Sequence, residues 1–144
     1  MKPTKIEQSG QSLVELAISL IVILLLLLGA VEVSLALFQY VTIRDAAQEG
    51  VIYGTINPTD DNGIKYRAVA AASDVLLLNP GSLEITRNNN KSCEGLTNNL
   101  PNTITVKINF AHPISFPLVG PMIGSDTINL TAVVTSTILQ PTCP

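Results

Sequence analysis

The chain has 144 residues, of which 47% are hydrophobic and 13% charged, and its formal net charge is −3. This length allows one small domain beside a membrane anchor. The acidic balance, the 4% aromatic content and the lack of a basic run beyond the first residues argue against nucleic-acid binding. There is no nucleophile elbow, phosphate-binding loop or cluster of metal ligands, so we expect no enzyme, no cofactor and no metal site.

An uncharged apolar run covers Leu16–Val31 and continues beyond Glu32 as far as Phe38. A helix rises about 1.5 Å per residue, so the run with its continuation is long enough to cross a hydrocarbon core of about 30 Å. Lys2 and Lys5 precede the run, and by the positive-inside rule the N-terminus is predicted to be cytoplasmic. We therefore expect a single-pass membrane protein whose C-terminal part lies outside.

The residues before the run have three interpretations. A short polar leader ends at Gly10, and a carboxylate, Glu15, follows five residues later. Glu15 is either an interfacial residue that reaches water or a partner for an amine of a neighbouring subunit. Cleavage after Gly10 would supply that amine at Gln11, and a carboxylate packed among apolar helices needs such a partner. The third interpretation is a signal peptide cut after Ala36, although the apolar region exceeds a usual h-region.

Three segments of the N-terminal part of the chain resemble a known family. Gly10–Gln11, with Glu15 at mature position five, looks like a type IV prepilin processing site. The stretch from Ser12 to Ser34 resembles the TadE-like pseudopilins of tight-adherence (Tad) pili, and Ile43–Gly54 resembles the end of that family's helix. Major pilins of the same system often carry tyrosine after the glutamate, where this chain has Leu16.

The resemblance implies a minor pseudopilin, a structural subunit that a prepilin peptidase cuts after Gly10 and that assembles through its N-terminal helix. The implied partners are this peptidase, other pilins or pseudopilins, the pilus assembly platform and the membrane. The implied location is the bacterial cytoplasmic (inner) membrane, or the pilus at the cell surface. The alternative is a signal-anchored surface binding protein that does not polymerise.

One long helix is predicted from Ser12 to about Tyr53, because Gly50, Gly54 and Asn57-Pro58 favour its end. We expect it to project from the membrane as a stalk. A bend near Gly29 or Ser34 is the alternative.

A second, amphipathic helix is predicted between a capping turn, Thr59–Gly63, and the helix breaker Asn79-Pro80-Gly81. Its apolar residues recur at three- and four-residue steps, which indicates one core-facing stripe. The stripe consists of Ile64, Ala68, Ala71, Val75 and Leu78.

Three segments alternate between apolar and polar residues and are predicted to be strands: Ser82–Arg87, Thr103–Phe110 and Asp126–Ile138. One apolar and one polar face predict an antiparallel sheet. The expected fold class is therefore α+β, with a long N-terminal transmembrane and stalk helix, a second helix and a small antiparallel β-sheet. We expect a leader at residues 1–10, the transmembrane and stalk helix at 11–56, and an extracytoplasmic α+β domain at 57–144.

Two further features lie in the connections. The segment from His112 to Ile123 is apolar for a loop, so it either folds back over the core or forms a contact patch. The chain has two cysteines, Cys93 and Cys143, and an even pair outside the membrane predicts a disulfide. Closing a loop of about 50 residues would contribute roughly 4 kcal/mol of stability.

Overall fold

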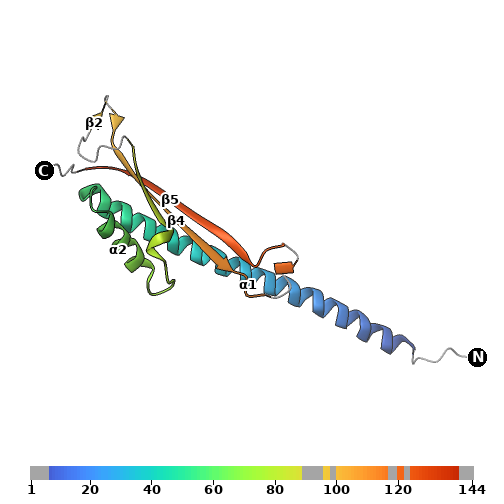
Figure 1. Cartoon of the computed structure of the whole chain (residues 1–144). Helices are drawn as coiled ribbons and strands as arrows, with labels where there is room; N and C mark the ends of the chain where they lie inside the picture. The colour runs from blue at the N-terminus through green and yellow to red at the C-terminus, as the bar shows by residue number, and fades with distance from the viewer. Residues whose placement is uncertain (1–6, 89–95, 98–99, 117–119, 122–123, 140–144) are drawn as a thin grey trace, which may run out of the picture.

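The computed structural model describes residues 7–88, 96–97, 100–116, 120–121 and 124–139. A 50-residue helix, α1 (Glu7–Ile56), runs the length of the molecule. The second helix and the sheet lie along the C-terminal half of α1, and its N-terminal half extends away from them (Figure 1). The structure confirms the predicted α+β fold, with one long apolar helix, a second helix and an antiparallel sheet.

Helix α1 is longer than predicted at both ends. It begins at Glu7, so the last residues of the predicted leader are helical, while residues 1–6 lie outside the described part. It continues without interruption through Gly29 and Ser34, where the Ser34 hydroxyl donates to the Ala30 carbonyl at 2.7 Å. The predicted membrane-length helix is therefore present as one unbroken element.

The expectation that Gly50 and Gly54 favour the end of the helix was wrong. A Cβ added at Gly50 would lie 3.2 Å from Ala68 Cβ, and one added at Gly54 would lie 2.6 Å from Ile104 Cδ1. The glycines let α2 and the sheet approach α1 closely, and the helix ends only at Ile56, just before Pro58. The C-terminal half of α1 is accordingly a core helix, not a free stalk.

Helix α2 (Asp61–Ala72) begins where predicted and ends earlier. Asp60 is its N-cap and accepts the Gly63 N–H at 2.9 Å. The chain leaves the helix after Ala72, whose carbonyl accepts the N–H groups of both Val75 and Leu76. The buried residues of this segment are Ile64, Ala68, Ala72, Leu76 and Leu78, so the predicted stripe was wrong at Ala71 and Val75, which are exposed.

The sheet has the order β1–β4–β5, with all neighbours antiparallel. Its strands are β1 (Leu83–Arg87), β4 (Thr103–Pro113) and β5 (Thr127–Thr137). A one-turn 3-10 helix (Pro80–Ser82) precedes β1, and a separate small pair joins β2 (Leu96–Thr97) to β3 (Leu100–Pro101). Leu83 pairs with Ile108, and Thr103 pairs with Thr137.

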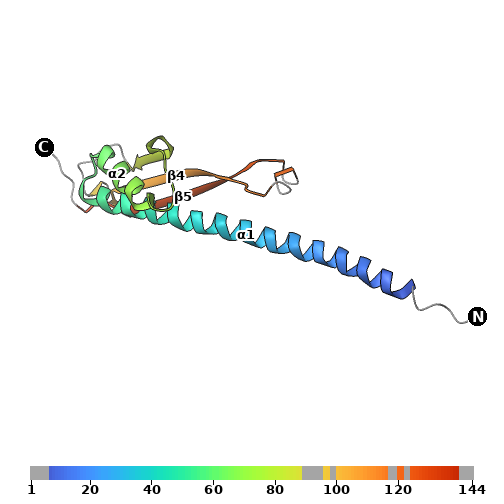
Figure 2. The ribbon, with the colours of Figure 1, turned by 90° about the horizontal axis from the view of Figure 1, so that it is seen from below.

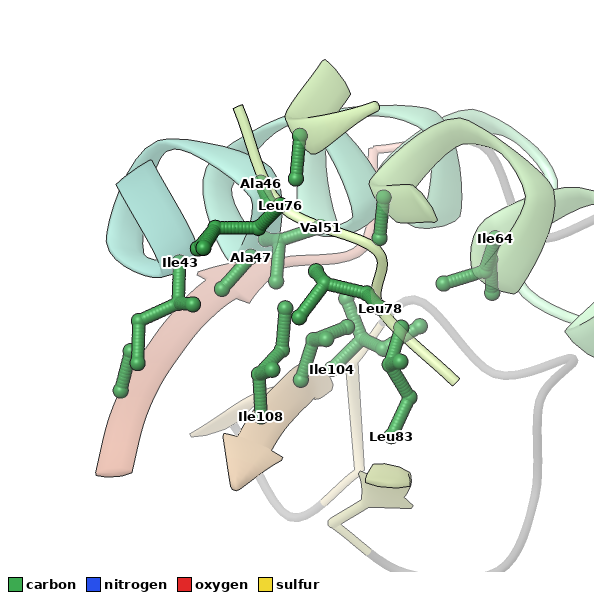
Figure 3. Close-up of a cluster of buried hydrophobic side chains, with 14 of the residues drawn as sticks. Ile43, Ala46, Ala47, Val51, Ile64, Leu76, Leu78, Leu83, Ile104 and Ile108 are labelled. Carbon is green, nitrogen blue, oxygen red and sulfur yellow. The ribbon is translucent and has the colours of Figure 1, made fainter. Parts of the chain in front are cut away.

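The core lies between the apolar face of the sheet and the two helices (Figure 3). The predicted alternation in β4 is confirmed, because Ile104, Val106 and Ile108 are fully buried and Phe110 is partly buried, while the polar residues between them are not buried. The largest members from three elements, Ile43, Ile64 and Ile104, have no exposed surface. Each such buried side chain contributes roughly 1.5–3 kcal/mol. The remaining members are Ala46, Ala47, Val51, Ala68, Ala72, Leu76, Leu78, Leu83, Val106, Ile108, Ala132 and Ile138.

Strands β4 and β5 continue beyond this core as a two-stranded ribbon along α1 (Figure 2). β4 runs to Pro113, so the connection predicted to begin at His112 starts two residues later. Of the loop itself, residues 117–119 and 122–123 lie outside the described part. Cys93 and Cys143 also lie outside it, and their disulfide stays a prediction.

Candidate functional site

The N-terminal turns of α1 carry the predicted processing and assembly residues. Gln11 and Glu15 are four residues apart on one helix and therefore share a face. They line a shallow surface groove with Gly10 and Ser19, and the Ser19 hydroxyl donates to the Glu15 carbonyl at 2.8 Å. A Cβ added at Gly10 would meet no atom within 4 Å. The bond between Gly10 and Gln11 is thus exposed on an isolated helix.

Glu15 lies on the same unpacked helix, among exposed apolar side chains. Leu13 and Leu16 are 67% and 64% exposed, respectively. Among the residues that the structure describes, the Glu15 carboxylate has no ion-pair partner. An unpaired carboxylate surrounded by apolar surface can bind an amine that another helix supplies.

The apolar run ends at a second carboxylate, Glu32, which is buried. Glu32 is 6% exposed and His112 is 2% exposed. Glu32 Oε1 lies 3.1 Å from His112 Nε2 and accepts the backbone N–H of Ser115 at 3.0 Å. These contacts join the far end of β4 to the middle of α1.

The other ring nitrogen of His112 contacts α1 about two turns C-terminal to Glu32. His112 Nδ1 lies 2.6 Å from Gln39 Oε1, so each ring nitrogen has a polar partner on α1. The cluster of Glu32, Gln39, His112 and Ser115 fixes the position of the ribbon against α1.

Comparison with known proteins bears on the N-terminal part of the chain. Residues 10–51 match the model of a family described as TadE-like protein. This segment, called the TadE-like segment below, is similar to that family. The match confirms the resemblance and supports an association with Tad pili. No curated protein and no solved structure gave a match to the chain.

The TadE-like segment includes both Gly10–Gln11 and Glu15 and reaches into the core half of α1. Within the described residues, Gly10–Ile56 is the one helix that is long and apolar enough to cross a membrane, judged by length and composition. This helix fits a single-pass anchor. Helix α2 and the sheet lie beyond the TadE-like segment, so their architecture rests on the structure alone.

Sequence reasoning missed the cluster around Glu32, although signals for it exist. Gln39 follows Glu32 by seven residues and precedes Ile43 by four, which places all three on one helix face. His112 follows Phe110 by two residues and so continues the inward face of β4. The predicted strand ended at Phe110 because the next inward residue is polar.

A further polar cluster, separate from Glu15 and the Glu32 cluster, lies at the N-terminal cap of α2. The Tyr53 hydroxyl donates to Asp60 Oδ2 at 2.9 Å, and Arg67 lies 5.6 Å from the centre of the Tyr53 ring. The Gly63 N–H and then the Tyr53 hydroxyl lower the pKa of Asp60, and the bond to Asp60 raises the pKa of Tyr53. Arg87 donates to the Pro58 carbonyl at 2.6 Å and pairs with Asp61.

In the described part of the chain, no group of three or more His, Cys, Asp or Glu residues is placed to hold a metal ion. The polar contacts found there include helix caps, salt bridges, the Glu32 contacts and cross-strand pairs such as Thr105 and Thr135.

Proposed function

We propose that this protein is a minor pseudopilin of a Tad-type pilus, processed after Gly10 and assembled through α1. One observation carries the proposal: Gly10 and Glu15 stand at prepilin spacing inside the TadE-like segment, on a helix whose surface is unpacked. A membrane anchor alone has no need for this spacing. The partners are a prepilin peptidase, other pilins or pseudopilins, the assembly platform and the membrane.

Glu15 would act in assembly through its charge. In a lone subunit the carboxylate reaches interfacial water, whereas in a bundle of apolar helices it loses that water. The amine of Gln11 on a neighbouring subunit would then stabilise the charged form and set the axial register of the two helices. Leaving one charge of a desolvated pair alone typically costs about 3–5 kcal/mol, so the pairing selects correctly placed subunits.

The minor role is proposed because Leu16 occupies the position where major pilins often carry tyrosine. The orientation follows from charge, because Lys2 and Lys5 precede the apolar run and favour a cytoplasmic N-terminus. The folded domain would then lie outside the cytoplasmic membrane until the subunit is taken into a filament.

The signal-peptide alternative conflicts with the packing of α1. Cleavage after Ala36 would separate Glu32 from the rest of the chain and leave buried His112 without its carboxylate partner. An uncleaved surface binding protein keeps these contacts, and it is the alternative that the experiment must separate from a pseudopilin.

N-terminal sequencing of the membrane-extracted protein, after co-expression with a cognate prepilin peptidase, tests the proposal. We expect a mature chain that begins at Gln11, and no cleavage in a Gly10→Leu variant. The mature chain carries one more net negative charge, because the leader holds two lysines and one glutamate. Recovery of Leu37 as the first residue would contradict the proposal, as would an uncut chain in the presence of an active peptidase.

A further inference from the structure

The β4–β5 ribbon ends beside the point where the apolar run of α1 ends. Ser115, just past β4, donates its backbone N–H to Glu32, and His112 lies against the same carboxylate oxygen. In both views the loop-side end of the ribbon lies level with the middle of α1 (Figures 1 and 2). Ser115, at the start of the connection between β4 and β5, is therefore held next to the part of α1 that would emerge from a bilayer.

The length of the apolar run places Glu32 relative to that bilayer. A hydrocarbon core of about 30 Å takes about 20 helical residues. A span that begins at Leu13 reaches Glu32, and a span that begins at Leu16 reaches Leu35. Glu32 thus lies at or just inside the hydrocarbon edge on the side of the folded domain. A bare carboxylate is costly there, and the ribbon supplies the partners that satisfy it.

The loop has the composition of a membrane-contacting segment. Between Lys107 and Asp126 the sequence contains no Lys, Arg, Asp or Glu. Of its described residues, Ile114 and Phe116 keep part of their surface exposed and Pro121 is exposed. An uncharged segment with exposed apolar groups favours the boundary between headgroups and acyl chains.

The described backbone of this loop is also suited to a poorly hydrated site. The N–H of Ile114 bonds to the Asp126 carbonyl at 3.0 Å, and those of Gly124 and Ser125 bond to the Gly120 carbonyl at 2.9 and 3.2 Å. The Ser115 N–H bonds to Glu32. Because unpaired backbone groups are costly near hydrocarbon, these four bonds lower the cost of immersion.

An apolar groove of about 540 Å³ lies between α1 and β5 at the same level. It begins inside the apolar run and extends past Glu32, so it is continuous with the surface that a bilayer would cover. Its apolar lining comes from Gly29, Val33, Ala36 and Leu37 of α1 and from Ile128 and Leu130 of β5.

We propose that the described part of the β4–β5 loop, residues 114–116, 120–121 and 124–126, is a second membrane contact of this protein. Ile114, Phe116 and Pro121 lie at the headgroup boundary of the leaflet on the side of the folded domain, and acyl chains of that leaflet fill the groove. Asp126 is exposed and bonds through its carbonyl to Ile114, so its charge sets the limit of immersion. The contact requires only that α1 spans a bilayer, and it does not depend on pilus assembly.

Single tryptophans test the contact directly, because the chain has none of its own. The full-length protein is reconstituted in phosphatidylcholine vesicles as Phe116→Trp and, separately, as Pro121→Trp. Tyr66→Trp serves as the water-exposed control, since Tyr66 is 74% exposed on α2, and Leu24→Trp serves as the membrane-embedded control. Circular dichroism checks that each variant keeps its secondary structure.

We expect brominated acyl chains to quench Phe116→Trp and Pro121→Trp much more than Tyr66→Trp, with quenching that approaches that of Leu24→Trp. Quenching at both positions no stronger than at Tyr66→Trp would overturn the contact. Emission shifted to shorter wavelength without quenching would also overturn it, because the loop would then pack against protein, such as a second copy. Two positions are used so that a local disturbance at Phe116 does not decide the result.

Discussion

His112 Nε2 and Glu32 Oε1 lie 3.1 Å apart although 80 residues separate them in the chain. Both side chains are buried, at 2% and 6% exposure. The contact fastens the outer part of the β4–β5 ribbon to α1, beyond the apolar core that holds its inner part. It thereby links the membrane-length half of α1 to the folded domain.

Removing one member of this pair is expected to destabilise the protein strongly. His112→Leu leaves the buried Glu32 carboxylate with the Ser115 N–H but without its imidazole partner, and loss of a buried hydrogen-bond partner typically costs about 1–3 kcal/mol, more for a charged group. The double variant Glu32→Leu/His112→Leu leaves neither polar group and should cost less than the sum of the two single changes. Denaturant unfolding of the full chain in detergent measures all three. If the loss of unfolding free energy in the double variant equals the sum of the losses in the two single variants, the two side chains do not interact energetically.

The close approach of α1 to the sheet predicts a second effect. A Cβ at Gly54 would lie 2.6 Å from Ile104 Cδ1, so the fully buried Ile104 side chain would have to shift within the core. Gly54→Ala should therefore destabilise the fold by about 1–3 kcal/mol, as overpacked cores do. Gly29→Ala is the matched control on the same helix, because no atom lies within 4 Å of an added Cβ. We expect it to be neutral or to stabilise the helix by about 0.5–1 kcal/mol. Thermal melts that rank Gly54→Ala as at least as stable as Gly29→Ala would contradict the packing described.

The cap of α2 predicts a pH dependence. Hydrogen bonds from Gly63 and Tyr53 lower the pKa of Asp60 below its ordinary value of 3.8. A carboxylate with a lowered folded-state pKa stabilises the fold above its unfolded pKa, and this contribution is lost as the pH falls through the folded pKa. The denaturant concentration at the unfolding midpoint should therefore decrease as the pH is lowered below about 4. In Asp60→Asn this decrease should be smaller. Asp74→Asn, at an exposed position after α2, is the control and should leave the decrease in stability at low pH unchanged. If stability decreases as steeply at low pH in Asp60→Asn as in the parent, the Asp60 cap is not the source of the pH dependence.

The parts of the fold that depend on local patterns could be predicted from the sequence. The alternation through Ile104, Val106 and Ile108 marks β4 correctly, and the Asp60 cap marks the start of α2. The apolar run marks the membrane-length helix because Leu16–Val31 is uncharged and almost entirely apolar, and its apolar character continues past Glu32. These features arise from neighbours in the chain, which is where periodicity carries information.

The remaining features depend on contacts between distant segments. Gly50 and Gly54 act as close-approach sites because Ala68 and Ile104 pack against them, and a glycine that breaks a helix has the same local sequence. His112 is buried because Glu32 and Gln39 face it from another element. When the position of α1 is not known, a polar residue after an apolar strand predicts the start of a loop.

The role of Glu15 is the central claim, and the assembly of a Glu15→Leu variant tests it most directly. In cells that express the complete pilus system, affinity-tagged protein is purified from membranes and the associated pseudopilins are quantified. Glu49→Leu, an exposed glutamate on the same helix, is the control, because Glu32 is buried in a structural pair and cannot serve. We predict that Glu15→Leu inserts and is cleaved after Gly10 but loses pseudopilin association and pili, while Glu49→Leu keeps both. Normal association and piliation in Glu15→Leu would contradict the proposed pairing and leave Glu15 as an interfacial residue of an ordinary anchor.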